Sequence, residues 1–213
     1  MDNPNKRRRK FNDPGLVLAG GKWCAPSSCL WASPFSISEF EVIGTQYPDL
    51  ERFFVKQLRV KTASVSMLVG QLTKLAKEQR PPVKRMQQML IEIGTMMARS
   101  GVDDKLSKAL EGLQKVKFLP IKVLNSTPTL AGIDDDFAIP DHPRFERAFQ
   151  GHLVILDLSL DESQILDSLF RHLGLVDRYL SNAVKETSVV GEGALESRVL
   201  SQDLRAKAYA LFW

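Results

Sequence analysis

Three successive stretches of apolar side chains at helical spacing most constrain how this chain folds. They cover about residues 64–79, 82–100 and 103–116. In each stretch apolar residues recur every three or four positions, which is the pattern of a helix that buries one face. Pro81–Pro82 ends the first stretch and starts the second, because proline fits the first turn of a helix but not its interior. The pattern predicts three helices that pack through these faces.

A fourth helix is expected earlier, because Pro48 suits a helix start and apolar residues follow it at helical spacing as far as Leu58. Before it, residues 15–40 are rich in glycine, proline and serine, which indicates irregular structure with short extended pieces. Within this region, Gly15–Trp23 departs from a phosphate-binding loop, because an extra glycine intervenes and Trp23 occupies the position of the required hydroxyl residue. A glycine-rich turn is the better interpretation.

The second half of the chain predicts short strands and short helices. Residues 118–124 have the pattern of an edge strand, because Pro120 cannot donate a hydrogen bond within a sheet. Residues 152–157 form the most strand-like segment. Further elements are expected in this order: a short strand at 137–139, a helix at 143–149, a helix at 161–172 capped by Asp161, and a short helix at 176–183.

The expected fold class is α+β and mainly α-helical, with an N-terminal helical group followed by a small sheet and packed helices. We divide the chain into a disordered basic arm at 1–14, an irregular segment plus four-helix group at 15–116, and a small α+β region at 117–213. We expect the last region to pack on the preceding helices.

The net charge of +4 is concentrated at one end of the sequence. The first ten positions hold Asp2 and five of the 29 basic residues, and the other 24 basic residues are matched by 24 acidic ones. The basic residues of this arm are Lys6, Arg7, Arg8, Arg9 and Lys10. Such a run suits a solubilising tail, a nuclear-import signal or a phosphate-binding arm. A nucleic-acid function would therefore depend mainly on the arm.

The sequence favours a protein of the nucleus or cytoplasm that does not enter a membrane. It has no run of 18 apolar residues, and no apolar signal core follows the basic arm. Its two cysteines, Cys24 and Cys29, fit a reducing compartment. They would give zinc only two of its four ligands, and the three histidines lie far away without paired spacing, so two small thiols are the better interpretation.

The motifs for catalysis are incomplete. Asp157 follows an apolar strand, as a nucleophilic carboxylate would, but Ser159 replaces the second acid and Asp161 suits a helix cap. His142 follows Asp141, which would orient it as a base, yet Pro143 makes either residue an ordinary cap. The acidic run Asp134–Asp136 lacks calcium-loop spacing. An enzyme would use Asp157, Asp161 and His142, but the sequence predicts no catalytic, cofactor or metal site.

Several segments resemble an internal region of very large fungal proteins. They cover 23–31 (Trp-Cys-Ala-Pro-Ser-Ser-Cys-Leu-Trp), 137–149, 154–157, 173–181, 186–188 and 204–211. Those proteins carry an ATPase domain of the heat-shock-chaperone and histidine-kinase type and are related to the plant NO VEIN protein. The resemblance implies a region downstream of the ATPase domain. The family's nucleotide-binding pattern is absent here, so no ATP-site residue is carried over.

A last amphipathic helix is expected from Ser201 to the end of the sequence. Its apolar residues form a possible partner surface: Leu204, Ala208, Leu211, Phe212 and Trp213. We therefore expect a non-enzymatic interaction or scaffold module, a fragment or shortened relative of a larger protein, which binds another protein or a missing domain of a longer form. The alternative is a nuclear factor that associates with nucleic acid through its basic arm.

Overall fold

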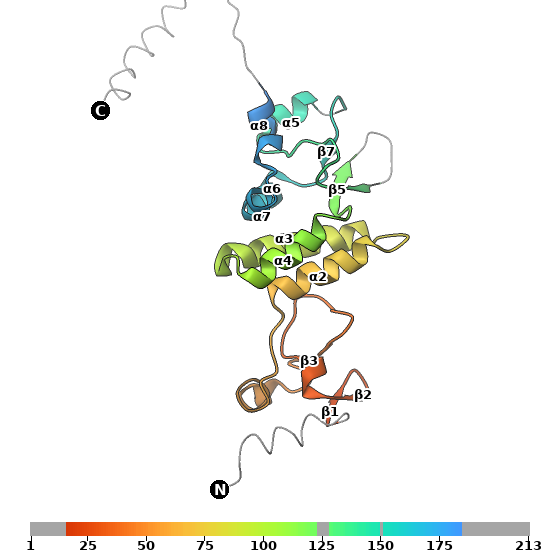
Figure 1. Cartoon of the computed structure of the whole chain (residues 1–213), viewed down its shortest axis with the longest axis vertical. Coiled ribbons are helices and arrows are strands. Elements are labelled where there is room, and N and C mark those ends of the chain that lie inside the picture. The colour runs from red at the N-terminus through yellow and green to blue at the C-terminus, as the bar shows by residue number, and fades with distance from the viewer. Residues whose placement is uncertain (1–15, 123–127, 150, 185–213) are drawn as a thin grey trace, which may run out of the picture. The chain divides into compact units, whose positions relative to one another are not determined.

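The computed structural model describes residues 16–122, 128–149 and 151–184, which form a mainly helical α+β fold (Figure 1). Helices that pack on one another are combined with small sheets of short strands, so the predicted fold class is confirmed. All the described elements up to Ala183 belong to one compact unit.

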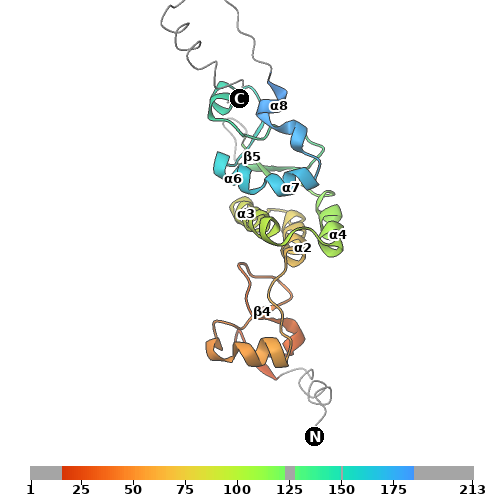
Figure 2. The same cartoon turned by 90° about the vertical axis from the view of Figure 1, so that its left-hand side faces the viewer.

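Three of the four predicted helices are present as α-helices: α2 (Val65–Ala76), α3 (Val83–Ser100) and α4 (Asp104–Leu113). The side chains of Ser64 and Asp103 cap α2 and α4 by accepting hydrogen bonds from main-chain N–H groups. Helix α2 packs against both α3 and α4 (Figure 2). The apolar faces of these three helices form the centre of the main core, and their burial stabilises the fold.

The helix predicted from Pro48 differs from expectation. A 3₁₀-helix, η2 (Pro48–Leu50), is followed by a π-helix, η3 (Arg52–Gln57). The wider turn is closed by a bond from the N–H of Leu58 to the carbonyl of Phe53. This winding buries Phe54 in a second apolar cluster, so packing overrides the regular helical pattern.

That second cluster is built around two small strand pairs. Strands β1 (Val17–Ala19) and β2 (Lys22–Cys24) form an antiparallel hairpin, whose turn is Gly20–Gly21 with φ values of 57° and 77°. Positive φ at both positions is the reason that glycine occupies this two-residue turn, which confirms the glycine-turn interpretation. After the 3₁₀-helix η1 (Pro26–Ser28), β3 (Cys29–Leu30) pairs in parallel with β4 (Glu41–Val42).

The second half contains a three-stranded sheet in the order β6–β5–β7. Its strands are β5 (Leu119–Lys122), β6 (Thr129–Ala131) and β7 (Ile155–Leu156). The prediction of an edge strand at 118–124 is wrong, because β5 is central. Pro120 is tolerated there because it lies at the end of the β5–β7 ladder, where its carbonyl accepts a bond from the N–H of Asp157. Residues 137–139 form only isolated bridges, to Ile155 and Tyr179.

Short helices complete the fold. These are α5 (Pro143–Phe149), α6 (Leu160–Ile165), α7 (Asp167–His172), the 3₁₀-helix η4 (Val176–Arg178) and α8 (Leu180–Ala183). Helices α6 and α7 pack on α3, and β5 also contacts α3 (Figure 2). The sequence predicts Asp161 as the N-cap of α6, and that prediction is wrong. Ser159 caps α6 in a capping box with Glu162, which satisfies two N–H groups reciprocally.

Candidate functional site

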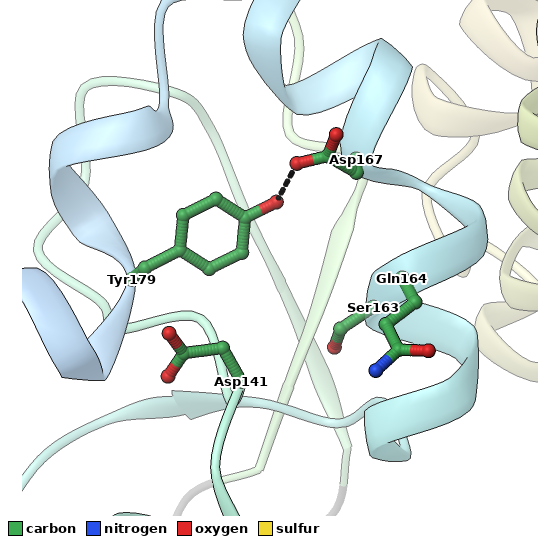
Figure 3. A pocket seen from close by; sticks show the side chains of 5 residues that line it. All are labelled: Asp141, Ser163, Gln164, Asp167 and Tyr179. Atoms are coloured by element: carbon green, nitrogen blue, oxygen red, sulfur yellow. Dashed lines mark hydrogen bonds between the residues drawn. The ribbon is translucent and has the colours of Figure 1, made fainter. Parts of the chain in front are cut away.

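A pocket of about 400 Å³ lies beside α6 and α7. It is lined by Asp141, Ser163, Gln164, Asp167 and Tyr179 (Figure 3). Ser163 and Gln164 belong to α6, Asp167 begins α7, Tyr179 directly follows η4, and Asp141 precedes α5. The volume is within the range of pockets that hold small molecules or single side chains.

A main-chain bridge brings Asp141 and Tyr179 to the same place. Ile139 pairs with Tyr179, accepting from the N–H of Leu180 and donating to the carbonyl of Arg178. Asp141 follows this bridge by two residues, so both side chains are positioned by the same pair of hydrogen bonds. The geometry is therefore set by the backbone.

Asp167 and Tyr179 form a wall of the pocket that is fixed by side-chain hydrogen bonds. The Tyr179 hydroxyl donates to Oδ1 of Asp167 at 2.8 Å (Figure 3). The Nε of Arg171 donates to Oδ2 of Asp167 at 2.7 Å. The hydrogen bond from Arg171, with a further one from Tyr179, lowers the pKa of Asp167. Burial and the bond to Asp167 raise the pKa of Tyr179. At neutral pH, Asp167 is therefore ionised and Tyr179 is neutral.

Asp141 carries a negative charge on the opposite side. Its Oδ1 accepts from the N–H of Ser181 at 3.1 Å, and its Oδ2 accepts from the Ser181 hydroxyl. Both donors are neutral, whereas Asp167 is paired with the cation of Arg171. Asp141 therefore gives the pocket a negative charge that its described partners do not neutralise.

Ser163 differs from every other polar residue of the pocket. It is 1% exposed, and its hydroxyl is the one buried side-chain polar atom without a hydrogen-bond partner in the part of the chain that the structure describes. The hydroxyl points from α6 toward the side of the pocket where Asp141 and Tyr179 lie (Figure 3). An unsatisfied buried hydroxyl costs about 1–3 kcal/mol, so its presence requires an explanation.

The residues of the enzyme hypothesis do not come together. No hydrogen bond or ion pair joins His142, Asp157 and Asp161 within the described ranges. His142 is exposed, and its Nδ1 accepts a hydrogen bond from the N–H of Arg144 at 3.2 Å. It therefore acts as a cap of α5, which is one of the two roles that its sequence context indicates. The main chain of Asp157 bonds to the sheet and to Gln87 of α3. Asp161 is an exposed first-turn residue of α6.

The acidic loop has a structural role through its middle residue. The Asp135 carboxylate accepts from the N–H of Gly132 at 2.8 Å and from Lys117 at 2.9 Å, and the first of these bonds is the main cause of its lowered pKa. Asp134 and Asp136 are exposed. Across 16–122, 128–149 and 151–184, no group of three or more His, Cys, Asp or Glu side chains is arranged to hold a metal ion.

The two cysteines are free thiols in the N-terminal cluster. Burial, with smaller effects from Cys24 and Glu41, raises the pKa of Cys29 to about 11. A thiol with this pKa stays protonated at neutral pH, which makes it a poor nucleophile and metal ligand. The neighbouring Trp23 on β2 is 66% exposed.

Two groups of predicted site residues lie outside the described residues. They are the basic arm Lys6, Arg7, Arg8, Arg9 and Lys10, and the terminal surface Leu204, Ala208, Leu211, Phe212 and Trp213. Both remain predictions.

Sequence reasoning missed four of the five pocket residues. It considered Asp141 only as a partner for His142 or as a helix cap. The spacing of Asp167 and Arg171 is the single local signal, because residues four apart on a helix form ion pairs. Tyr179 reaches Asp167 only after the chain has turned at Gly174, which has a positive φ of 72°. No local pattern reveals that contact.

The described residues thus define a mainly helical α+β protein with a polar pocket beside α6 and α7. The chain belongs to the family described as domain of unknown function DUF8348, whose match covers residues 66–184, more than half of the chain. That region contains all five pocket residues, whereas the elements from β1 to η3 precede it.

Comparison with curated proteins and with solved structures gave no match. None of the helices in the described ranges combines the length and the apolar character needed to cross a membrane.

Proposed function

We propose that the chain is a non-enzymatic protein-interaction module that contacts its partner through the β1–β2 hairpin. The observation that carries this proposal is Trp23, which exposes 66% of its surface. It pairs with Leu18 across the hairpin, and Leu16, which is 44% exposed, directly precedes β1. Tryptophan is enriched among the residues that contribute most to protein interfaces.

The distribution of exposed apolar residues supports a binding region in the same part of the chain. Seven large apolar side chains are exposed among the described residues, and four of them precede the family region. These four are Leu16, Trp23, Leu50 and Phe53. All four lie within residues 16–53, near residues of the second cluster, so large apolar side chains are exposed more densely there than in the family region.

The residues of the enzyme hypothesis have structural explanations instead. His142 caps α5, and the main chain of Asp157 links the sheet to α3. Asp161 carries a favourable charge at the start of α6. These roles support binding over catalysis as the function of the chain.

Site-specific photo-crosslinking in cells tests the proposal. p-Benzoylphenylalanine replaces Trp23 in one variant and Val102, which is 45% exposed, in a control variant. We expect a distinct adduct with one other protein from position 23 and not from position 102. Trp23→Ser should then weaken binding of that purified protein by about tenfold. Absence of an adduct at position 23, or identical adducts at both positions, would contradict the proposal.

A second candidate function is nucleic-acid association through Lys6–Lys10. It is favoured by five consecutive basic residues in a chain whose remaining charge is balanced. This function predicts affinity for nucleic acid that falls steeply with salt and disappears when residues 6–10 are removed. Affinity that survives the deletion would exclude the arm as the binding element.

The predicted terminal helix and the resemblance would extend the first proposal. Leu204, Ala208, Leu211, Phe212 and Trp213 would add a second partner surface, and the chain would be a fragment or shortened relative of a larger protein with an ATPase domain. Deletion of Leu211–Trp213 should then abolish association with little effect on the free energy of unfolding. Loss of the folded state would instead identify these residues as core.

A further inference from the structure

We propose that the pocket of Asp141, Ser163, Gln164, Asp167 and Tyr179 binds an organic cation, a guanidinium or primary ammonium group. This site is distinct in its residues from the Trp23 hairpin, and neither proposal depends on the other.

The charge of the pocket favours a cation. Two carboxylates line it, and Arg171 offsets only that of Asp167. The charge of Asp141 is met by the neutral N–H and O–H groups of Ser181. An anionic ligand would be repelled by Asp141, whereas a cation would gain from it in a partly enclosed site where water screens charges less.

The hydrogen-bonding inventory favours a ligand with several donors. The carboxylates of Asp141 and Asp167 offer acceptor oxygens, and the Tyr179 oxygen can accept while its proton is given to Asp167. A guanidinium has five N–H donors and no acceptor, so it complements this set, and an ammonium group complements it with three. The half-buried Tyr179 ring also offers an aromatic surface to a cation.

Ser163 provides an independent observation that points to a ligand. Its hydroxyl is buried, lacks a partner and is directed into the pocket (Figure 3). A bound N–H donor would supply the absent hydrogen bond. The hydroxyl costs stability in the free protein, and this cost is recovered when the ligand binds.

The same chemistry is available from a free small amine and from an arginine side chain of a partner protein. Four probes separate these sources and test the charge requirement: agmatine, acetyl-Gly-Arg-Gly-amide, its neutral citrulline analogue and inorganic phosphate. Each is titrated into the ¹⁵N-labelled full chain, and amide shifts are followed by NMR.

We expect shifts at Ser163, Gln164 and Tyr179 with one or both cationic probes, and no shifts there with citrulline or phosphate. Tighter binding of agmatine would identify a free amine, and tighter binding of the tripeptide would identify a side chain. Failure of both cations, equal binding of the citrulline peptide, or binding of phosphate at these residues would overturn the proposal.

Three variants complete the experiment. Asp141→Asn should weaken binding of the cationic probe by about tenfold, while Glu111→Gln, an equal charge change on the exposed surface of α4, should leave it unchanged. Ser163→Ala should weaken binding by about fivefold and yet raise or preserve the melting temperature, because it removes an unpartnered hydroxyl. A lower melting temperature with unchanged probe affinity would show that Ser163 is only structural and would overturn its role.

Discussion

The side-chain amide of Gln87 donates a hydrogen bond of 2.9 Å to the main-chain carbonyl of Asp157. This bond joins α3 to the end of the sheet. Asp157 lies opposite Pro120 when the β5–β7 register is continued, and its N–H donates to the Pro120 carbonyl at 2.8 Å. Proline has no N–H to return, so the Asp157 carbonyl would lack a partner within the ladder. Gln87 supplies that partner.

Replacing Gln87 therefore tests how the sheet tolerates a central proline. Gln87→Ala leaves a half-buried carbonyl without its donor and should lower the free energy of unfolding by about 1–2 kcal/mol. Gln88→Ala, at the exposed neighbouring position, should change it by less than about 0.5 kcal/mol. Urea denaturation measures both, and equal effects would show that the bond contributes nothing specific.

Gly94 sets the close packing of α3 against α6 and α7. A Cβ atom at this position would lie 2.7 Å from the main-chain oxygen of Ile165 and 2.9 Å from Cδ2 of Leu166. Because the nearest atom belongs to the backbone, relief requires the helices to separate, and Gly94→Ala should cost about 1–3 kcal/mol.

Gly112 is the matched control for this substitution. It lies within α4, and a Cβ there would meet nothing within 4 Å. Gly112→Ala should therefore stabilise the protein by up to about 1 kcal/mol through helix propensity. Thermal and urea denaturation of both variants should give effects of opposite sign, and a stabilising Gly94→Ala would refute the packing account.

The N-cap of α6 gives a prediction that separates the observed cap from the one expected from sequence. The Ser159 hydroxyl accepts from the N–H of Glu162 at 3.2 Å, and the Glu162 carboxylate accepts from the N–H of Ser159 at 2.7 Å. Ser159→Ala should lower the free energy of unfolding by about 1 kcal/mol. Asp161→Ala should cost less, about 0.5 kcal/mol, because only its charge at the helix start is lost. The reverse order would restore Asp161 as the effective cap.

The lowered pKa of Asp167 makes part of the free energy of unfolding depend on pH. An aspartate in an unfolded chain has a pKa of about 3.9, above that of Asp167 in the folded protein. The stability that ionised Asp167 contributes is therefore complete above the unfolded-state pKa, and it is lost as the pH falls through the lower, folded-state pKa. Asp167→Asn should flatten the decline of unfolding free energy below about pH 4, whereas Asp136→Asn at an exposed position should not. Parallel curves for wild type and Asp167→Asn would contradict the assignment.

The main helices could be predicted from the sequence because their information is local. Periodic apolar residues, the caps Ser64 and Asp103, and Pro81–Pro82 all act within a few positions of the helix that they define. The central place of β5 could not be predicted in the same way. A proline reads as an edge residue unless the side chain of Gln87, from a different helix, is known to compensate for it.

The pocket could not be predicted from the sequence for a related reason. Asp141 and Tyr179 meet through the bridge between Ile139 and Tyr179, and Asp167 joins them from α7. Each residue alone has an ordinary sequence context. The lack of a partner for the Ser163 hydroxyl becomes visible only when every neighbour is placed.

The most direct test of the central claim compares Trp23→Ser with His142→Ala in binding the purified protein that crosslinks at position 23. If the chain acts by binding through the β1–β2 hairpin, Trp23→Ser should weaken that complex by about tenfold without loss of fold, and His142→Ala should leave its dissociation constant unchanged. Full affinity of the Trp23→Ser variant would contradict the account.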